Sequence, residues 1–355
     1  MIADAGEAAA PTEHYLRTYR TAAARRIAII TAALAVLAVT FTLDVLTGPA
    51  ELSLRQVVSA ITSPAAADPT THVIVWTLRL PMALMALVVG IALGAAGAEV
   101  QTILDNPIAD PYTLGLSASA GFGAAATILF GASLPIDPAY SSTVAAFCCS
   151  LVAAFVIMAV ARRQATVETM VLTGIALLFL AQAFLSLLEY LASPEALQTI
   201  VFWLFGSLAR ADWSKVAVVA AVLALLLPVL SRDAWRLTAL RLGEERARSL
   251  GVNVSALRLR VFTIIALLTA VAVSFVGTIG FVGLVAPHVA RMLVGEDQRY
   301  LLPMSAICGA LFLSAASVVA KMVVPGALFP IGIVTSLIGV PFFFALILRT
   351  RRGYW

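Results

Sequence analysis

The side chains that most often carry chemistry are few in this chain and widely spaced. Its three histidines, at positions 14, 72 and 288, are too far apart to predict a metal-binding cluster. Its two lysines, Lys215 and Lys321, do not follow a glycine-rich loop of the kind that holds nucleotide phosphates. We therefore expect a chain that is not an enzyme and binds no metal or cofactor itself. Any use of ATP and Mg²⁺ would belong to a partner chain.

Charge is concentrated in one short stretch, residues 231–261. Seven arginines there stand against three acidic residues, and the excess of four positive charges equals the net charge of the whole chain. The segment Glu244–Leu250 predicts a short helix, because Gly251 lies where a glycine commonly ends one. Such an amphipathic helix can lie on lipid headgroups or dock in a groove of another protein. Its mixed charge and its flanking glycines favour the protein groove.

The elements around this stretch are strongly apolar. Hydrophobic residues make up 61% of the chain and charged residues 12%, with a mean hydropathy of +1.00, whereas roughly a quarter of a soluble domain is charged. Stretches of about twenty apolar residues span a bilayer core, and helices satisfy their own backbone there. We therefore predict an all-α polytopic membrane protein with ten transmembrane helices, at residues 27–46, 80–103, 113–131, 140–161, 168–190, 213–231, 259–279, 281–296, 301–321 and 329–348.

The basic residues predict the orientation of these helices. With the N-terminus in the cytoplasm, ten spans return the C-terminus to the same side, and 18 of the 23 basic residues then lie in cytoplasmic segments. We expect a multi-pass protein of the cell inner (plasma) membrane with both termini cytoplasmic. Residues 1–26 would form a cytoplasmic tail, residues 27–355 one transmembrane domain and residues 232–258 its main cytoplasmic loop. A nucleic-acid partner is not expected, because the basic charge follows the topology.

Two features inside the spans allow alternative interpretations. Ionisable residues within a membrane are functional candidates, and Glu99 is one of them. We expect Glu99 to contact the polar turn around Asn106 and Asp110 or to reach the membrane interface. Small residues allow close helix packing in lipid, which is the expected role of several glycines, with the lining of a wide passage as the alternative: Gly90, Gly94, Gly97, Gly115, Gly121 and Gly123.

Five motifs stand in order along the chain. They are RLP at 79–81, NPIADPYTLG at 106–115, LGEERARSLGV at 242–252, FVGLVAPHVARMLVG at 281–295 and FPIGIVTSLIGVPFF at 329–343. The second resembles the NPLADP-x-x-LG signature of the FecCD-type permeases, and the fourth resembles their FVGL-x-x-PH-x-x-R segment. These permeases are the membrane subunits of ABC importers for ferric siderophores, heme and cobalamin. The resemblance covers essentially the whole chain beyond its N-terminal tail.

The resemblance implies a fold and an assembly. The fold is the ten-helix permease of type II ABC importers, paired with a second permease subunit around a central passage. The sequence leaves open whether that second subunit is identical. The other implied partners are two ABC ATPase subunits, a periplasmic or lipid-anchored substrate-binding protein, the membrane and a metal-chelate substrate.

The resemblance also implies roles for particular residues. ATPase coupling would use Arg241, Leu242, Gly243, Glu244, Glu245, Arg246, Ala247, Arg248, Ser249, Leu250 and Gly251. Docking of the binding protein would use Arg55, Lys321 and Arg210. The translocation path would be lined by Ala126, Leu172, Gly174, Gln182 and Ser336. Structural motif residues would be Asn106, Pro107, Asp110, Pro111, Pro287, His288 and Arg291, with Arg291 near the turn at 105–111.

These expectations lead to one main functional hypothesis. The chain would be the permease subunit of an ATP-driven importer that moves a ferric siderophore-type iron chelate across the inner membrane. Heme or cobalamin is the alternative cargo, and the sequence does not identify the chelate. A hypothesis from another class is an ion-coupled secondary transporter that uses Glu99, Lys321 or His288 and needs no ATPase.

Overall fold

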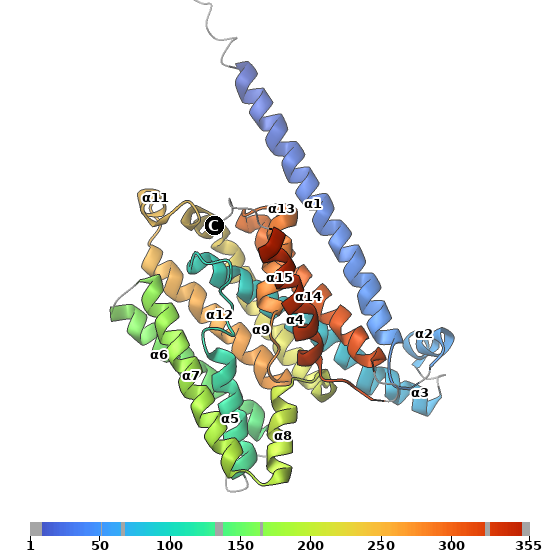
Figure 1. The fold of residues 1–355 in the computed structure, drawn as a ribbon. Helices are drawn as coiled ribbons and strands as arrows, with labels where there is room; N and C mark the ends of the chain where they lie inside the picture. Colours follow the sequence, from blue (N-terminus) through green and yellow to red (C-terminus); the bar gives the residue numbers. More distant parts are fainter. Residues whose placement is uncertain are drawn as a thin grey trace, which may run out of the picture.

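The computed structural model describes residues 9–50, 52–64, 68–131, 138–163, 166–323 and 327–349, and every regular element among them is helical (Figure 1). Residues 1–8 of the expected tail and the last residues, 350–355, lie outside the described part. The long helices are α1 (Ala9–Leu46), α4 (Leu80–Ile103), α5 (Leu116–Phe130), α6 (Pro138–Arg163), α7 (Val167–Leu191), α9 (Trp213–Arg232), α12 (Val254–Val276), α13 (Val282–Val294), α14 (Gln298–Met322) and α15 (Ile331–Arg349).

Shorter helices join these. They are α2 (Leu54–Thr62), α3 (Pro69–Val73), the π-helical turn η2 (Ile74–Arg79), α8 (Pro194–Leu204), the 3₁₀ turn η4 (Leu208–Arg210), α10 (Ala234–Leu240) and α11 (Glu244–Ser249). The three segments α3, η2 and α4 follow one another without a break, so this helix reaches well beyond the predicted start at residue 80.

The prediction of an all-helical membrane protein is confirmed, and each predicted span overlaps a helix. In the described residues, seven helices are long and apolar enough to cross a membrane. The apolar helices α5 and α13 are shorter, at 15 and 13 residues, and the apolar stretch of α15 covers only Ile331–Ala345. Ten full crossings therefore stay a prediction for these three helices. In α1, residues 9–26 of the expected tail continue the membrane helix, which projects past the bundle (Figure 1).

Helix α4 forms the centre of the bundle. In its most apolar stretch 72% of the residues are buried, as in α12, against 22% in α7 and α9. Glycines allow α14 to approach it closely, because a Cβ at Gly90 would stand 2.5 Å from the carbonyl oxygen of Gly309 and one at Gly94 2.3 Å from that of Ser305. The glycines of α4 therefore serve packing, as the first interpretation expected.

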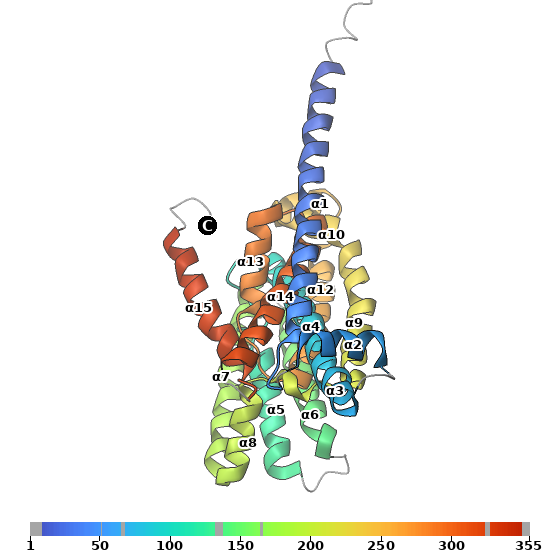
Figure 2. The same ribbon diagram turned by 90° about the vertical axis from the view of Figure 1, so that its right-hand side faces the viewer.

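The helices arrange the loops on two opposite ends of the bundle. One end carries α10 and α11 together with the N-terminal end of α1 and the C-terminal end of α15 (Figures 1 and 2). The other end carries α2, α3 and α8. The two ends of the described chain therefore lie on the same side as the arginine-rich loop, which is the relation that an even number of crossings requires.

Candidate functional site

The arginine-rich loop contains the short helix that its sequence predicts. Helix α11 ends at Ser249, and the amide of Val252 donates to the carbonyl of Ala247 at 3.0 Å while that of Gly251 donates to Arg248 at 2.9 Å. This pair of bonds is the Schellman motif, which needs a left-handed residue after the helix. Gly251 supplies it with φ 81°, and Gly243 begins the helix with φ 103°. We call residues 241–251 the island.

The island packs one face on its own chain and leaves the other exposed. Ala247 of the island is buried together with its neighbours Leu240 and Val254. Leu250 is 52% exposed, because the helix ends before it. Leu242 is also exposed, and so are the charged side chains between these two leucines, apart from the half-buried Glu244. The outer face is thus a mixed apolar and charged surface.

Ion pairs attach the island to the bundle. The Glu244 carboxylate meets Arg248 at 2.9 Å and the buried Arg258 at 2.7 Å, and Arg258 also donates to the backbone carbonyl of Ile103 at 2.9 Å. Arg241 pairs with acidic side chains outside the island. The island is therefore held against the ends of α4 and α12 rather than hanging as a free loop.

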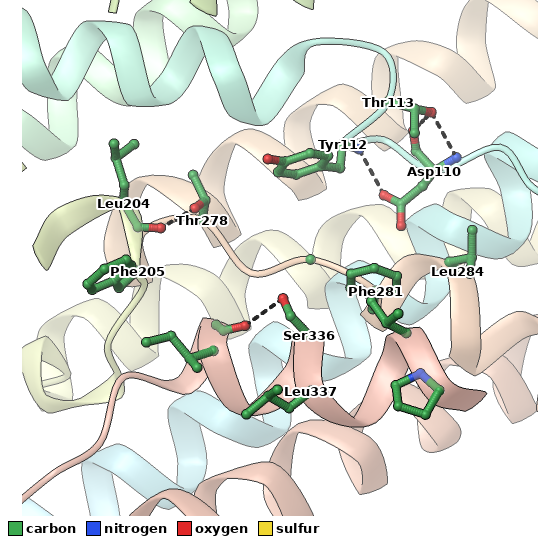
Figure 3. A pocket seen from close by; sticks show the side chains of 15 residues that line it. Asp110, Tyr112, Thr113, Leu204, Phe205, Thr278, Phe281, Leu284, Ser336 and Leu337 are labelled. Carbon is green, nitrogen blue, oxygen red and sulfur yellow. Dashed lines mark hydrogen bonds between the residues drawn. The ribbon is translucent and has the colours of Figure 1, made fainter. Parts of the chain in front are cut away.

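A hollow of about 690 Å³ lies elsewhere in the chain. Its wall combines the turn after α4, the end of α8, the segment between α12 and α13, and α15 (Figure 3). Most of the lining is apolar, and Tyr112, Phe205 and Phe281 contribute aromatic rings. The polar side chains in the wall are few: Asp110, Thr113, Thr278 and Ser336. An apolar wall with few polar groups offers little to bind a ligand tightly.

Of the predicted lining residues, only Ser336 borders this hollow. Its hydroxyl donates to the carbonyl of Gly332 at 2.8 Å (Figure 3). Gly174 is buried against Leu114, where an added Cβ would stand 2.9 Å from the leucine side chain, so in this structure it packs between helices and does not border the hollow. Ala126 packs within the apolar cluster of α5, α7 and α8. Leu172 and Gln182 lie exposed on α7, away from this hollow.

The turn after α4 shows why its motif residues are polar. Asn106 accepts a hydrogen bond from the amide of Ile108 at 3.1 Å, and Asp110 accepts one from that of Tyr112 at 2.8 Å. Burial raises the pKa of the Asp110 carboxyl to about 6, although the Tyr112 amide opposes this shift. The carboxylate faces the start of α13, since a Cβ at Gly283 would lie 3.3 Å from both of its oxygens. Pro111 is buried and Pro107 half-buried.

Sequence reasoning missed Phe281, which lies at the junction of α13 and α15. It adopts φ 68°, a left-handed conformation that is rare for a bulky residue. Its side chain contacts the glycine surface of α15, because a Cβ at Gly339 would stand 2.5 Å from the Cβ of Phe281. The glycine within the 329–343 motif was the available signal for this close approach.

The second motif segment places Arg291 close to its expected position. Its guanidinium donates to the side-chain oxygen of Gln101 at 3.0 Å, one turn before the 105–111 turn. Pro287 is buried inside α13, and His288 is half-buried. Glu99 is fully buried, and neither of its carboxylate oxygens has a hydrogen-bond partner among the described residues. Glu99 therefore makes no hydrogen bond to the polar turn around Asn106 and Asp110, and its side chain does not reach the surface of the chain.

The expected docking residues differ in exposure. Arg55 is exposed on α2, which begins with a capping box between Ser53 and Gln56. Arg210 is half-buried in η4, and its backbone carbonyl accepts from Lys215 at 2.6 Å. Burial also lowers the pKa of the Arg210 guanidinium.

The prediction of an exposed docking charge at Lys321 is wrong. Its side chain is 2% exposed, and its ammonium lies 2.6 Å from a carboxylate oxygen of Asp44 and 2.7 Å from the backbone oxygen of the same residue. Ser317 donates to the same carboxylate at 2.7 Å. The physical reason is that α14 continues through Lys321 and packs along α1, which turns this position inward.

Comparison with known proteins identifies the relatives of this arrangement. The model of the FecCD transport family matches residues 36–349. The hemin transport system permease of Yersinia pestis is 37% identical over 308 residues, which cover 86% of this chain and 90% of that protein. The cobalamin import system permease of Halobacterium salinarum is 39% identical over 285 residues, 80% of this chain and 75% of that protein. A solved metal-chelate type ABC transporter in an inward-facing conformation has a TM-score of 0.80 at 31% identity, and the match covers 91% of this chain and 99% of that one.

Proposed function

This chain belongs to the FecCD transport family and is a permease subunit of an ABC importer of the metal-chelate type, and from this premise we propose that its cargo is a ferric siderophore-type chelate. Membership of this family argues against the alternative hypothesis of an ion-coupled secondary transporter. The observation that supports transport of a bulky ligand is the hollow of about 690 Å³ with its mostly apolar wall. Heme and cobalamin, which two relatives import, are the competing cargoes.

We also propose the partners that the two loop-bearing ends of the bundle meet. An ABC ATPase, which supplies the ATP and Mg²⁺ chemistry, would grip the exposed face of the island on the cytoplasmic side. A substrate-binding protein would dock at the opposite end, where Arg55 is exposed on α2. With the island in the cytoplasm, both termini are cytoplasmic too. A second permease subunit would cover the hollow, which is open in the single chain.

The mechanism that follows is alternating access driven from the island. Closure of the ATPase subunits displaces a helix that is clamped in their groove, and rigid helices carry the displacement to the wall of the hollow. The wall needs no strong ligand site, because the binding protein selects the cargo and release must stay favourable. The exposed Arg55 at the docking end would steer and orient the binding protein more than it would add affinity.

The coupling role predicts the effect of reversing charge on the island. Arg246→Glu with Arg248→Glu should reduce uptake at least tenfold while the protein still inserts, because both side chains point away from the bundle toward the proposed groove. Uptake is measured in cells that also make the ATPase and the binding protein, and the ATPase is followed by co-purification. Arg163→Glu is the matched control, since Arg163 is an exposed arginine at the end of α6. Unchanged uptake in the island variant would remove the coupling assignment.

Uptake by the same cells also tests which cargo is transported. A radiolabelled ferric hydroxamate, hemin and cobalamin are supplied separately, and each is competed by the other two in excess. The proposal expects uptake of the ferric hydroxamate and no competition by hemin or cobalamin. Uptake of hemin alone or of cobalamin alone would overturn the siderophore assignment and leave the importer assignment standing.

A further inference from the structure

One arginine of the island, Arg241, forms ion pairs with two turns of the bundle at once. Arg241 places Nη1 2.7 Å from a carboxylate oxygen of Asp105, in the turn between α4 and α5. Its Nε and Nη2 donate to the two carboxylate oxygens of Glu296 at 3.2 and 2.7 Å, in the turn between α13 and α14. The two bonds to Glu296 form the forked geometry that gives an arginine–carboxylate pair directional strength. The Arg241 side chain is 19% exposed, whereas its partners Asp105 and Glu296 are 80% and 49% exposed, so the arginine is covered while its carboxylate partners remain open to solvent.

Asp105 lies at the end of α4, at a position where a carboxylate-bearing residue is locally unfavourable. Helix α4 ends in a Schellman motif, in which Asn106 donates to Gln101 at 3.1 Å and Asp105 to Thr102 at 3.3 Å. The left-handed position of that motif, φ 43°, is held by Asp105, where glycine costs least. A carboxylate at the C-terminal end of a helix also opposes the helix dipole. Two local preferences are therefore broken at this residue, and the pair with Arg241 offsets them.

Glu296 connects Arg241 to a second chain of contacts. Its carboxylate also lies 3.5 Å from Nε of Arg291, on the last turn of α13. Arg291 donates to Gln101, and the Gln101 amide donates to the carbonyl of Gly283 at 3.4 Å, in the first turn of α13. Glu296 is thereby connected through side-chain contacts to both ends of α13.

Both turns that Arg241 holds continue into the wall of the hollow. The α4–α5 turn leads from Asp105 to Asp110, Tyr112 and Thr113, and α13 begins beside Phe281 and carries Leu284 (Figure 3). The other attachment of the island, from Glu244 through Arg258 to Ile103, ends on helices of the buried core. Arg241 is thus a side chain through which the island directly contacts both turns that lead into the wall of the hollow.

We propose that Arg241 is a positioning residue that transmits displacement of the island to two segments of the cavity wall, the α4–α5 turn through Asp105 and α13 through Glu296. This inference rests on the proposed coupling function and adds the route by which coupling reaches the passage. It assigns different roles to arginines of the same island. Arg246 and Arg248 meet the ATPase, whereas Arg241 meets the bundle.

The main test measures movement, and this part of it needs no knowledge of the cargo. In a chain whose Cys148, Cys149 and Cys308 are replaced by alanine, spin labels are placed in pairs, and Leu225 on α9 is the common reference. One pair reports the island through Ser249, and the other reports α13 through Met292, which is exposed. Distances are measured by pulsed electron resonance in the complex with its ATPase subunits, without nucleotide and with Mg-ATP and vanadate.

We expect the two spin-label pairs to respond differently to nucleotide trapping in the variants. In the parent chain both distances shift on nucleotide trapping. In Arg241→Gln the island shift remains, while the α13 shift falls to less than half. Asp105→Gly is expected to keep the α4–α5 turn folded, with thermal stability equal to or above that of the parent chain, and to halve uptake of ferric hydroxamate per ATP hydrolysed. Glu296→Gln should reduce the α13 shift as Arg241→Gln does.

A neighbouring ion pair supplies the matched control. Arg260 lies 2.7 Å from Asp233 at the base of the same loop, and Asp233 keeps Arg236 as a second partner at 2.8 Å. Arg260→Gln should leave both distance shifts unchanged. A full α13 shift in Arg241→Gln and Glu296→Gln would overturn the transmission role and leave the proposed function intact. The absence of any nucleotide-dependent shift in the parent complex would instead overturn the proposed coupling role of the island, and the inference with it.

Discussion

The Lys321–Asp44 pair joins α14 to α1 inside the bundle. Both side chains are almost fully buried, and Ser317 donates a further hydrogen bond to the Asp44 carboxylate. Breaking a buried pair by removing one partner leaves an uncompensated charge, whereas replacing both partners by apolar groups is often nearly neutral. The pair therefore bears on how α1 is held in the fold and not on docking at the outer surface.

Removing the lysine should destabilise the protein strongly. We expect Lys321→Met to lower the free energy of unfolding by about 3–5 kcal/mol, and Asp44→Leu with Lys321→Leu to recover most of that loss. Thermal unfolding in detergent measures both. Lys215→Met is the matched control, because Lys215 pairs with the exposed Asp212 at 2.8 Å, and such pairs contribute about 0–1 kcal/mol. Equal losses in the two single variants would contradict the role of burial.

At the scale of elements, α4 and α14 pack closely because glycines at their contact carry no side chain. A Cβ at Gly309 would stand 2.1 Å from the carbonyl oxygen of Gly90, and one at Gly97 would stand 1.9 Å from that of Gly283 on α13. The second contact places α13 close to α4, and α13 carries part of the cavity wall. Close approach of backbones in this layer is what keeps the contacts of Gln101 and Arg291 within hydrogen-bond distance.

Adding one methyl group should separate these helices. Gly309→Ala is expected to cost about 1–3 kcal/mol of folding free energy, because the atoms in its way are backbone and cannot rotate aside. Gly131→Ala is the control, since the nearest atom to a Cβ there lies 3.5 Å away and the backbone is right-handed. Thermal unfolding and the yield of folded protein are the measurements. A tolerated Gly309→Ala would show that α4 and α14 can shift without penalty.

At the scale of the molecule, the two surfaces proposed to meet partners lie at opposite ends of the bundle. The island and both ends of the described chain lie at one end of the bundle, and α2 with Arg55 lies at the other (Figure 1). The hollow lies among segments that connect to both. This separation allows one partner to supply force and another to deliver cargo without competing for the same surface.

Charge reversal at the outer end should weaken docking of the binding protein. Arg55→Glu is expected to lower its affinity severalfold at low salt, with a smaller difference at high salt, because exposed charges are screened. Titration of the reconstituted transporter with purified binding protein measures the affinity. Arg25→Glu makes the same charge change on α1 at the island end, where Arg25 is exposed, and should bind normally. Wild-type affinity in Arg55→Glu would remove this surface from the docking site.

What could be predicted from the sequence follows from local physics. Hydropathy over about twenty residues predicts a membrane helix without knowledge of its neighbours, so the predicted spans all fall on helices. The short helix in the arginine-rich loop could be placed because glycine at a left-handed position is a local requirement, which Gly251 meets. The motifs at 106–115 and 281–295 carried the family assignment for the same reason, since they can be compared residue by residue.

What only the tertiary structure decided depends on how the helices rotate and meet. Lys321 is buried because α14 turns it toward Asp44, 277 residues away, and Arg241 reaches Asp105 and Glu296 across 136 and 55 residues. The hollow likewise draws its wall from four separate segments of the chain. Such partners are brought together by packing, in which a rotation of one helix changes every neighbour of a side chain while its local sequence stays the same.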